Sequence, residues 1–580
     1  MVLTQWQVAE PANETRRQLA AELSLSPLLC QILINRGITD AAAAGKFLAP
    51  SLHDLHDPYL LSGMDVSVQR IVAAILGNEQ MAVYGDYDVD GVSGTALLLT
   101  FFRSLGLHAA YHIPERQAEG YGINPDAICK LAGLGARLLI TVDCGSTAVE
   151  EVALASRLGI DTIITDHHQP PDILPDAVAV VNPHQQACGY PNKHLCGVGL
   201  VFKLLTALRA HMRQAGVLSE RLPNLKRHLD LVALGTIADV TPMRGENRVI
   251  VQHGLEELTR THKPGLQALR QVSGRQGKSA SVGEVGFQLA PRLNASGRLG
   301  SAEHSLELLM ASEAAEAETL AARLDDVNRE RRTLQADIER AVHERIDRQY
   351  GGTPPAALVL ADADWHLGVV GIVAARIAEV YHRPTFLLQI EGTTARGSGR
   401  SIPSFDLYDG LQHCAEWLER FGGHRYAAGL TVAVENLAAL QEAFVRYADD
   451  RLQAGDLRPV LRLESVVSLA DIDRAMVNEL ASLEPHGPGN PTPVLAACGV
   501  RVASSIRRLG QEGQHARFRV EQNGHSLEVI AFRIADRVAQ AAAEGSALDI
   551  AFVPVINTWG NRQTLELQLR DLRPHTPGLD

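Results

Sequence analysis

The chain has 580 residues and a formal net charge of −13, from 54 lysines and arginines against 67 aspartates and glutamates. A chain of this length is too long for one hydrophobic core, which predicts roughly three or four domains. No apolar run approaches the roughly 20 residues of a membrane-spanning helix, so no membrane association is expected. The cysteines are seven and scattered, and the first ten residues lack a secretory pattern, so a cytoplasmic protein is expected.

The first half of the chain alternates strand and helix patterns. Residues 1–60 are expected to form a small helical lead-in, and residues 61–310 a larger domain that is mainly helical after position 200. Strands and helices in alternation predict a parallel sheet covered by helices on both faces. Its expected strands are 81–84, 109–113, 138–142, 162–165 and 178–181, with helices that include 92–105 and 148–158.

The second half begins with a long amphipathic pattern. Residues 313–350 carry an apolar stripe at helical spacing and end at a pair of glycines, which predicts a connecting helix within 311–352. Residues 353–452 return to an α/β pattern, with strands expected at 357–360 and 386–390. Residues 453–580 show short strands and turn signals, which favour a small β-barrel or sandwich.

Three aspartates, Asp86, Asp88 and Asp90, follow the first apolar strand within five positions. Like charges this close repel one another, so they favour either solvent or a bound cation. A solvated acidic loop is the plain alternative, because short acidic clusters are common on protein surfaces. The residues at the ends of the neighbouring strands help to decide between a bound cation and a solvated loop.

Acidic and imidazole side chains also follow the next buried strands. Asp143 follows one strand, and Asp166, His167 and His168 follow another. The carboxyl ends of parallel strands meet at one edge of a sheet, where ligands bind. Asp239, after an apolar helical segment, is placed to close the same site. Carboxylates and imidazoles in this number suit Mn²⁺ or Mg²⁺.

Four short motifs carry these residues in a recognisable order. They are 86–91 (DYDVDG), 142–145 (VDCG), 166–168 (DHH) and 235–239 (GTIAD). As a set they resemble the motifs of the DHH phosphoesterase family. Further segments resemble one branch of it, the single-stranded-DNA-specific exonucleases that add a DHHA1 domain and a C-terminal OB-fold. Those segments are 286–298, 397–401, 421–424 and 483–493.

The resemblance covers nearly the whole chain and implies a two-metal site. In the family, carboxylates and the first DHH histidine hold two divalent cations, here Mn²⁺ or Mg²⁺, with Asp143 placed to bridge them. The implied ligands are Asp86, Asp88, Asp143, His167 and Asp239. His168 would then act near the scissile phosphate as a catalytic group, with Asp166 orienting a histidine.

Two positions near this set are less simply interpreted. The helix-entry position of Asp90 predicts capping or support of the ligands rather than ligation. Many family members have a histidine two residues before the first aspartate, whereas Tyr84 stands there in this chain. The first cation is then expected to be held more weakly, or to be completed by water.

Arginines and a few small residues are implied as substrate contacts. Arginine suits phosphate because its planar fork binds two oxygens at once. The resemblance places Arg298 and Arg400 near the scissile phosphate, and Arg116, Ser398 and Gly399 at the 5′-terminal phosphate. Such a pocket would explain a 5′→3′ polarity. The remaining implied contacts are Asn294, Gly423 and His424.

The function implied is a metal-dependent 5′→3′ exonuclease that degrades single-stranded DNA to mononucleotides in repair and recombination. Five arginines between Ala496 and Arg519 also suit a single-strand groove. A monomer is expected, with a single-strand-binding protein and a helicase as partners from the family alone. The rivals are a hydrolase of short oligonucleotides or cyclic dinucleotides, a silent DNA-binding scaffold, and a tRNA-editing protein.

One further set of histidines and cysteines is an alternative candidate for a zinc site. It comprises His184, Cys188, His194 and Cys196. Their spacing matches no familiar zinc-ligand pattern, so an ordinary loop is the favoured interpretation.

Overall fold

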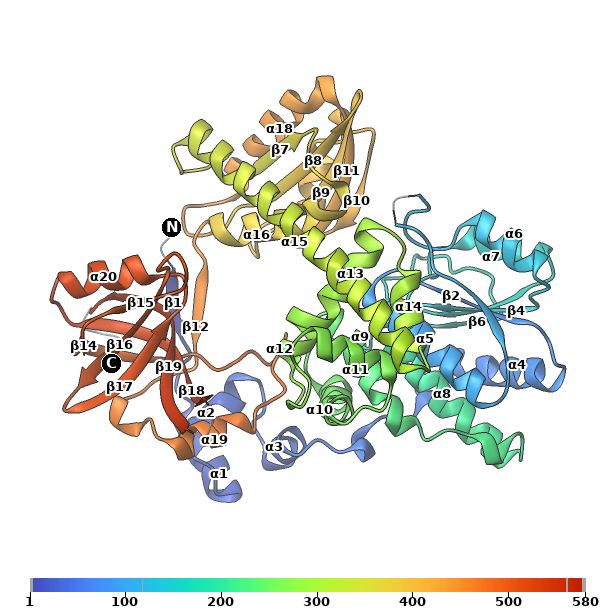
Figure 1. The fold of residues 1–580 in the computed structure, drawn as a ribbon, viewed down its shortest axis with the longest axis horizontal. Helices are drawn as coiled ribbons and strands as arrows, with labels where there is room; N and C mark the ends of the chain where they lie inside the picture. Colours follow the sequence, from blue (N-terminus) through green and yellow to red (C-terminus); the bar gives the residue numbers. More distant parts are fainter. Residues whose placement is uncertain (1–3, 117, 560–561, 576–580) are drawn as a thin grey trace. The chain divides into compact units, whose positions relative to one another are not determined.

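The computed structural model describes residues 4–116, 118–559 and 562–575 (Figure 1). The chain divides into two compact units. The first unit is Leu52–Leu457, and the second unit combines Leu3–Ser51 with Arg458–Asp580. The sequence did not foresee that the N-terminal segment belongs with the C-terminal one, because strand pairing between distant segments leaves no local pattern.

The first unit begins with the parallel sheet expected from the sequence. The strand order is β3-β2-β4-β5-β6, and every neighbouring pair is parallel. The strands are β2 (Met81–Gly85), β3 (Ala109–His112), β4 (Leu138–Val142), β5 (Asp161–Thr165) and β6 (Ala179–Val181). The predicted strand bounds are confirmed to within a residue or two, because each strand is a short buried apolar run.

Helices cover both faces of this sheet, as Figure 1 shows around β2 and β4. Val83 and Ile140 enter the large core formed with α4, α5, α8 and α9, whereas Ala82 and Leu139 enter the smaller core under α6 and α7. The helical elements of this part are η1 (Leu52–Asp54), η2 (Pro58–Leu60), α4 (Met64–Leu76), α5 (Val89–Ser104), α6 (Pro125–Gly133), α7 (Val149–Arg157), α8 (Gly197–Gln214), η3 (Ser219–Arg221), η4 (Leu225–His228), α9 (Leu229–Ala238), α10 (Gly245–Thr259), α11 (Pro264–Val272), α12 (Val282–Glu284), η5 (Val285–Leu289), α13 (Ala290–Leu299) and α14 (Glu303–Met310).

The long helix predicted from the apolar stripe is α15 (Ala314–Tyr350). At about 1.5 Å per residue it spans roughly 55 Å. Ala317, Ala321 and Leu324 of its first half lie in the core of the parallel-sheet domain. Ile338 and Val342 of its second half lie in a core shared with the next domain. One helix therefore contributes to two cores, which makes it the connector that the sequence predicted.

The next domain is built on a mixed five-stranded sheet, in the order β10-β11-β9-β8-β7. The sequence predicted β7 and β8 but not the other three strands, because glycines interrupt the apolar alternation of β9. The elements are β7 (Leu358–Asp362), α16 (Leu367–Tyr381), β8 (Thr385–Glu391), β9 (Thr394–Arg400), α17 (Leu407–His413), η6 (Ala415–Trp417), β10 (Arg420–His424), β11 (Ala427–Ala433), η7 (Val434–Asn436) and α18 (Leu437–Arg451).

The second unit contains the small barrel expected at the C-terminus. Its strand order is β13-β14-β18-β19-β17-β16-β15, and an added pairing of β14 with β16 closes the ring. Strand β1 pairs in parallel with β12, which ties the N-terminal segment to this unit. Its elements are β1 (Gln5–Val8), α1 (Asn13–Leu23), α2 (Pro27–Asn35), α3 (Ala41–Leu48), β12 (Val460–Leu463), β13 (Ser465–Val466), η8 (Leu469–Asp471), α19 (Arg474–Ala481), β14 (Leu495–Val502), β15 (Arg507–Leu509), β16 (His515–Gln522), β17 (His525–Ala531), α20 (Ala535–Ala543), β18 (Leu548–Trp559) and β19 (Arg562–Pro574).

No single helix of the described residues is long and apolar enough to cross a membrane, although the bent pair Leu52–Leu60 and Met64–Leu76 passes on length and composition.

Candidate metal centre and phosphate site

The first aspartate motif forms a turn between strand β2 and helix α5. Asp88 is the N-cap of α5, because its carboxylate accepts hydrogen bonds from the backbone N–H groups of Asp90 and Gly91 at 2.9 and 3.2 Å. The predicted capping of α5 thus falls to Asp88 rather than Asp90. Asn294 of α13 accepts from the N–H of Val89 at 3.2 Å and fixes the same turn from outside.

Asp90 faces a different helix. It is almost completely buried, and its two carboxylate oxygens accept hydrogen bonds from the first N–H groups of α8, those of Gly197 and Val198, at 2.5 and 2.9 Å. One of these oxygens also lies 3.8 Å from His167 Nε2. Asp90 therefore caps α8 and not the helix to which it belongs. Its approach to His167 was not predicted from the sequence.

Asp143 lies at the centre of the cluster. It follows β4 in a left-handed conformation, with φ of 63°, which aspartate tolerates better than most residues. It is buried, and one oxygen lies 3.0 Å from His167 Nε2. The start of α8 comes so close that a Cβ on Gly197 would lie 2.5 Å from the Asp143 Cβ.

Three groups of side chains in this cluster could each hold a metal ion, and two of the three contain Asp143. In one, ligand atoms of Asp86, Asp88 and Asp143 lie within 4.8 Å of one another, and in another those of Asp90, His167 and Asp239 do. The structure thus brings all five predicted metal ligands together and adds Asp90 to them. His168 joins Asp143 and His167 in a third group.

The donor atoms of this cluster fit divalent cations. Asp86 Oδ1, Asp143 Oδ1 and His167 Nε2 are buried and form no hydrogen bond among the described residues, although the last two atoms lie 3.0 Å apart. Buried polar atoms are almost always satisfied, so atoms left open in this way indicate a ligand. Carboxylate oxygens with one imidazole are a donor set for Mn²⁺ or Mg²⁺.

The electrostatics of the cluster support the same conclusion. Burial and the charge of Asp88 raise the pKa of Asp86 to about 8, and burial with the charge of Asp90 raises the pKa of Asp239 to about 8. Burial and the nearby His168 lower the pKa of His167 to about 4, which leaves a neutral imidazole suited to ligation. A bound cation would relieve the repulsion among the carboxylates.

The second histidine of the motif is held by the aspartate before it. Asp166 Oδ1 accepts from the His168 backbone N–H at 3.0 Å and lies 2.8 Å from His168 Nδ1. Burial opposes protonation, yet the hydrogen bond and charge of Asp166 raise the pKa of His168 to about 9. The predicted orienting role of Asp166 agrees with this geometry.

Three arginines lie near one another beside the cluster: Arg116 after β3, Arg298 in α13 and Arg400 in β9. Arg116 follows β3, and its guanidinium stacks 4.2 Å from the Tyr87 ring centre. Arg298 of α13 donates to the backbone carbonyl of Gly368 at 3.2 Å. Burial, followed by the charges of Arg116, Arg331 and Arg400, lowers the pKa of Arg298. Partly buried, mutually repelling cations of this kind suit an anionic ligand such as phosphate.

The other predicted substrate residues occupy different surroundings. Ser398 and Arg400 lie on the face of β9 towards α16, where a Cβ on Gly371 would lie 3.3 Å from Ser398 and 3.6 Å from Arg400. Gly399 points to the opposite face and leaves room for the Phe386 ring. Gly423 and His424 lie on the edge strand β10, which β11 separates from β9.

Tyr84 does not take the place of a metal ligand. Its side chain is fully buried in the core on the other face of the sheet, under α6 and α7. Its hydroxyl donates to the carbonyl of Gly122 at 2.9 Å. The missing histidine is therefore not replaced functionally by the tyrosine.

The four residues of the alternative zinc site belong to the protein interior or to hydrogen-bonded loops. Cys188 and Cys196 are buried, and Cys196 Sγ lies 3.4 Å from the hydroxyl of Thr236. Among the described residues, the candidate metal groups do not include either cysteine. The interpretation as an ordinary loop agrees with this.

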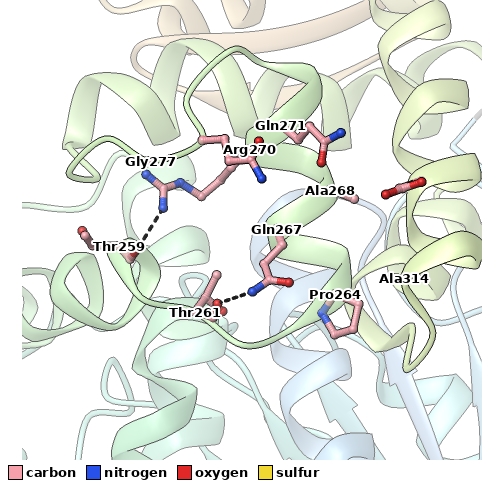
Figure 2. Close-up of a pocket in the computed structure, with 11 residues that line it drawn as sticks. Thr259, Thr261, Pro264, Gln267, Ala268, Arg270, Gln271, Gly277 and Ala314 are labelled. Atoms are coloured by element: carbon pink, nitrogen blue, oxygen red, sulfur yellow. Dashed lines mark hydrogen bonds between the residues drawn. The ribbon is translucent and has the colours of Figure 1, made fainter.

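A cavity of about 370 Å³ lies elsewhere in the first unit (Figure 2). It is lined by α11 and by the segment around Thr259 and Thr261. Its buried cation, Arg270, is bound to Glu284 at 2.7 Å and donates to backbone carbonyls, including that of Thr259. Gln267 donates to the Thr261 carbonyl at 2.8 Å. Because the polar groups of Arg270 and Gln267 already have partners, this cavity is a weaker candidate for the functional site than the aspartate cluster.

Family models match three parts of the chain. Residues 80–236 match the DHH family N-terminal domain, residues 354–450 the DHHA1 domain, and residues 463–571 the RecJ OB domain. A curated relative from Bacillus subtilis, single-stranded-DNA-specific exonuclease RecJ, is 38% identical over 98% of this chain and 70% of its own length. The chain belongs to the RecJ family.

Other RecJ proteins extend this result to the whole fold. RecJ of Escherichia coli is 33% identical over 95% of this chain and 96% of its own length. The crystal structure of Thermus thermophilus RecJ in complex with Mn²⁺ superimposes with a TM-score of 0.82 and 30% identity, over 99% of this chain and 80% of that one. The Mg²⁺ complex gives a TM-score of 0.75. The RecJ fold thus includes the parallel-sheet domain, the long helix, the DHHA1 domain and the barrel found here.

Proposed function

We propose that this RecJ-family chain hydrolyses single-stranded DNA from its 5′ end and releases mononucleotides, in DNA repair and recombination. The observation that carries this proposal is the buried aspartate and histidine cluster with three arginines beside it. The names of the relatives supply the substrate class, and the cluster supplies the chemistry. A silent DNA-binding scaffold is disfavoured, because such a chain would have no need of buried carboxylates without partners.

Two divalent cations, Mn²⁺ or Mg²⁺, are proposed for the cluster. Asp86, Asp88 and Asp143 would hold one of them, and Asp143, His167 and Asp239 would hold the other together with Asp90. When bound, the two cations supply an activated water and stabilise the leaving oxygen of an in-line displacement.

The other residues of the site are proposed to bind and orient the phosphodiester. His168, held by Asp166 and half exposed, would donate a hydrogen bond to the scissile phosphate. Arg298 would bind a non-bridging oxygen of that phosphate. Arg400 would bind the same phosphate. Arg116, with Ser398 and Gly399, would bind the 5′-terminal phosphate of the strand.

That terminal pocket is the proposed source of the 5′→3′ polarity, because only one end of a strand presents a terminal 5′-phosphate. Asn294 would support the aspartate turn, and Gly423 and His424 would contact the strand from the DHHA1 domain. A monomeric state, and a single-strand-binding protein and a helicase as partners, are proposed from the family alone.

Digestion of end-labelled strands tests the proposal. Single strands labelled at either end, with or without a 5′-phosphate, are incubated with Mn²⁺ or Mg²⁺. We expect mononucleotides to appear first from the 5′ end, and an Asp143→Ala variant with an unchanged fold to be inactive. Release beginning at the 3′ end would overturn the polarity, and full metal-dependent activity of the variant would overturn the metal centre.

A further inference from the structure

Tyr121, in the turn between β3 and α6, contacts the second histidine of the motif. Its hydroxyl lies 2.9 Å from His168 Nδ1 and 3.4 Å from the backbone carbonyl of Asp143. The Tyr121 and His168 rings meet edge to face, with centroids 5.4 Å apart and an interplanar angle of 67°. Tyr121 is half exposed, so the hydrophobic core does not account for its position.

His168 needs an external contact to fix its orientation. Its side chain is 41% exposed, whereas that of Asp143 is 3% exposed. The Asp166 side chain contacts the ring at Nδ1, and the His167 ring packs against it with centroids 4.6 Å apart. The hydroxyl of Tyr121 approaches the same nitrogen from another direction, and its ring covers the imidazole. Two contacts from different directions restrict the ring plane as well as the position of one atom.

The turn that carries Tyr121 is itself held from the sheet. The buried Tyr84 hydroxyl donates to the carbonyl of Gly122 and accepts from Asn124 Nδ2 at 3.3 Å. Asn124 also caps α6, by accepting from the N–H of Ala127 at 2.7 Å. Strand β2 therefore delivers Asp86 to the cluster and, through Tyr84, fixes the turn beside it.

We propose that Tyr121 is a positioning residue that orients His168 towards the aspartate cluster, with Tyr84 supporting it through Gly122. This inference rests on the proposed function of the cluster. It adds a residue that acts through His168 and needs no contact with the metal ions or the strand. It also gives Tyr84, which is not a metal ligand, a supporting role.

The test compares Tyr121→Phe with the unmodified chain, using steady-state hydrolysis of a 5′-phosphorylated single strand in Mn²⁺. Loss of the hydroxyl removes one orienting contact, for which a fall in kcat of roughly 10-fold is expected. KM should stay within about twofold, because the phenyl ring keeps the shape of the surface. Tyr59→Phe is the matched control, since the half-exposed Tyr59 hydroxyl donates to the carbonyl of Ala207 in α8, at 3.5 Å, rather than to a residue of the cluster.

A double-variant cycle separates positioning from a general structural effect. If Tyr121 acts through His168, Tyr121→Phe should have no further effect in a His168→Ala background. Tyr84→Phe should lower kcat in the same direction, and it should add little to Tyr121→Phe. The thermal midpoint of Tyr121→Phe should match that of the unmodified chain.

The outcomes distinguish the inference from the function on which it rests. Unchanged kcat in Tyr121→Phe, a change confined to KM, or full additivity with His168→Ala would overturn the role of Tyr121, provided that Asp143→Ala is inactive. If Asp143→Ala and His168→Ala both keep full activity, the proposed function fails instead.

Discussion

Asp90 Oδ2 lies 3.8 Å from His167 Nε2, although one residue begins a helix and the other follows strand β5. The same carboxylate accepts hydrogen bonds from the start of α8. Asp90, in the first turn of α5, therefore contacts both the start of α8 and the residue His167 after β5. Burial and the charge of Asp88 raise the pKa of Asp90 to about 7, and the backbone N–H groups of α8 act in the opposite direction by stabilising its negative charge.

Asp90→Asn should weaken the metal centre without disrupting the fold. The amide keeps the size of the side chain, but it loses a negative charge and one acceptor for α8. We expect activity to fall by roughly 10-fold or more, with partial recovery at higher Mn²⁺. Activity as a function of Mn²⁺ concentration measures this. Asp126→Asn, an exposed position in the first turn of α6, is the control and should titrate like the unmodified chain.

Divalent cations should stabilise the chain against unfolding. The cluster leaves buried donor atoms open and raises the pKa of several carboxyls, so a cation that binds only the folded state adds stability. At 100 times the dissociation constant the gain is about 2.7 kcal/mol. Thermal midpoints with and without Mn²⁺ measure it. In Asp143→Ala the shift should be largely lost, and an equal shift in both proteins would contradict the assignment of Asp143 to the centre.

Much of the fold and site was predictable because its signals are local. The strand ends at Asp86, Asp143 and Asp166 follow buried apolar runs, and the parallel arrangement brings such ends together. The role of Asp90 was not predictable in this way, since it depends on where α8 packs. Tyr121 left no signal either, because its contact with His168 joins a turn to a distant strand end.

Arg116→Ala should reduce the advantage of a 5′-phosphate. Arg116 stacks on Tyr87, and its buried Nε has no hydrogen-bond partner among the described residues, so it is poised for an anion. A charged hydrogen bond contributes about 1.5–3 kcal/mol, which corresponds to at least a roughly 10-fold effect. The ratio of hydrolysis rates for strands with and without the phosphate should fall towards one. Arg376→Ala removes a surface arginine paired with Glu379 and should leave the ratio unchanged.

His228 should make stability depend on pH. Burial, and then the charge of Lys263, lower the pKa of His228 to about 4, below the usual value of about 6.5. Between these two pH values the unfolded chain binds more protons at His228 than the folded chain does. The free energy of unfolding is therefore highest, as far as His228 is concerned, above about pH 6.5, and it decreases as the pH falls towards 4. The thermal midpoint of His228→Gln should fall less steeply over that window than that of the unmodified chain. Parallel curves would exclude His228 as a contributor.

Two glycines of α8 provide a matched pair of variants that tests the geometry around Asp143. A Cβ on Gly197 would lie 2.5 Å from the Asp143 Cβ, whereas a Cβ on Gly199 would meet Leu195 at 3.4 Å, an ordinary contact. Gly197→Ala should therefore displace Asp143 and lower activity by roughly 10-fold or more. A displacement of about 1 Å at a catalytic centre can lower the rate by about 10²-fold. Gly199→Ala should keep full activity and gain up to about 1 kcal/mol of helix stability. Equal activity in the two variants would show that Asp143 tolerates movement and that the cluster does not depend on its position.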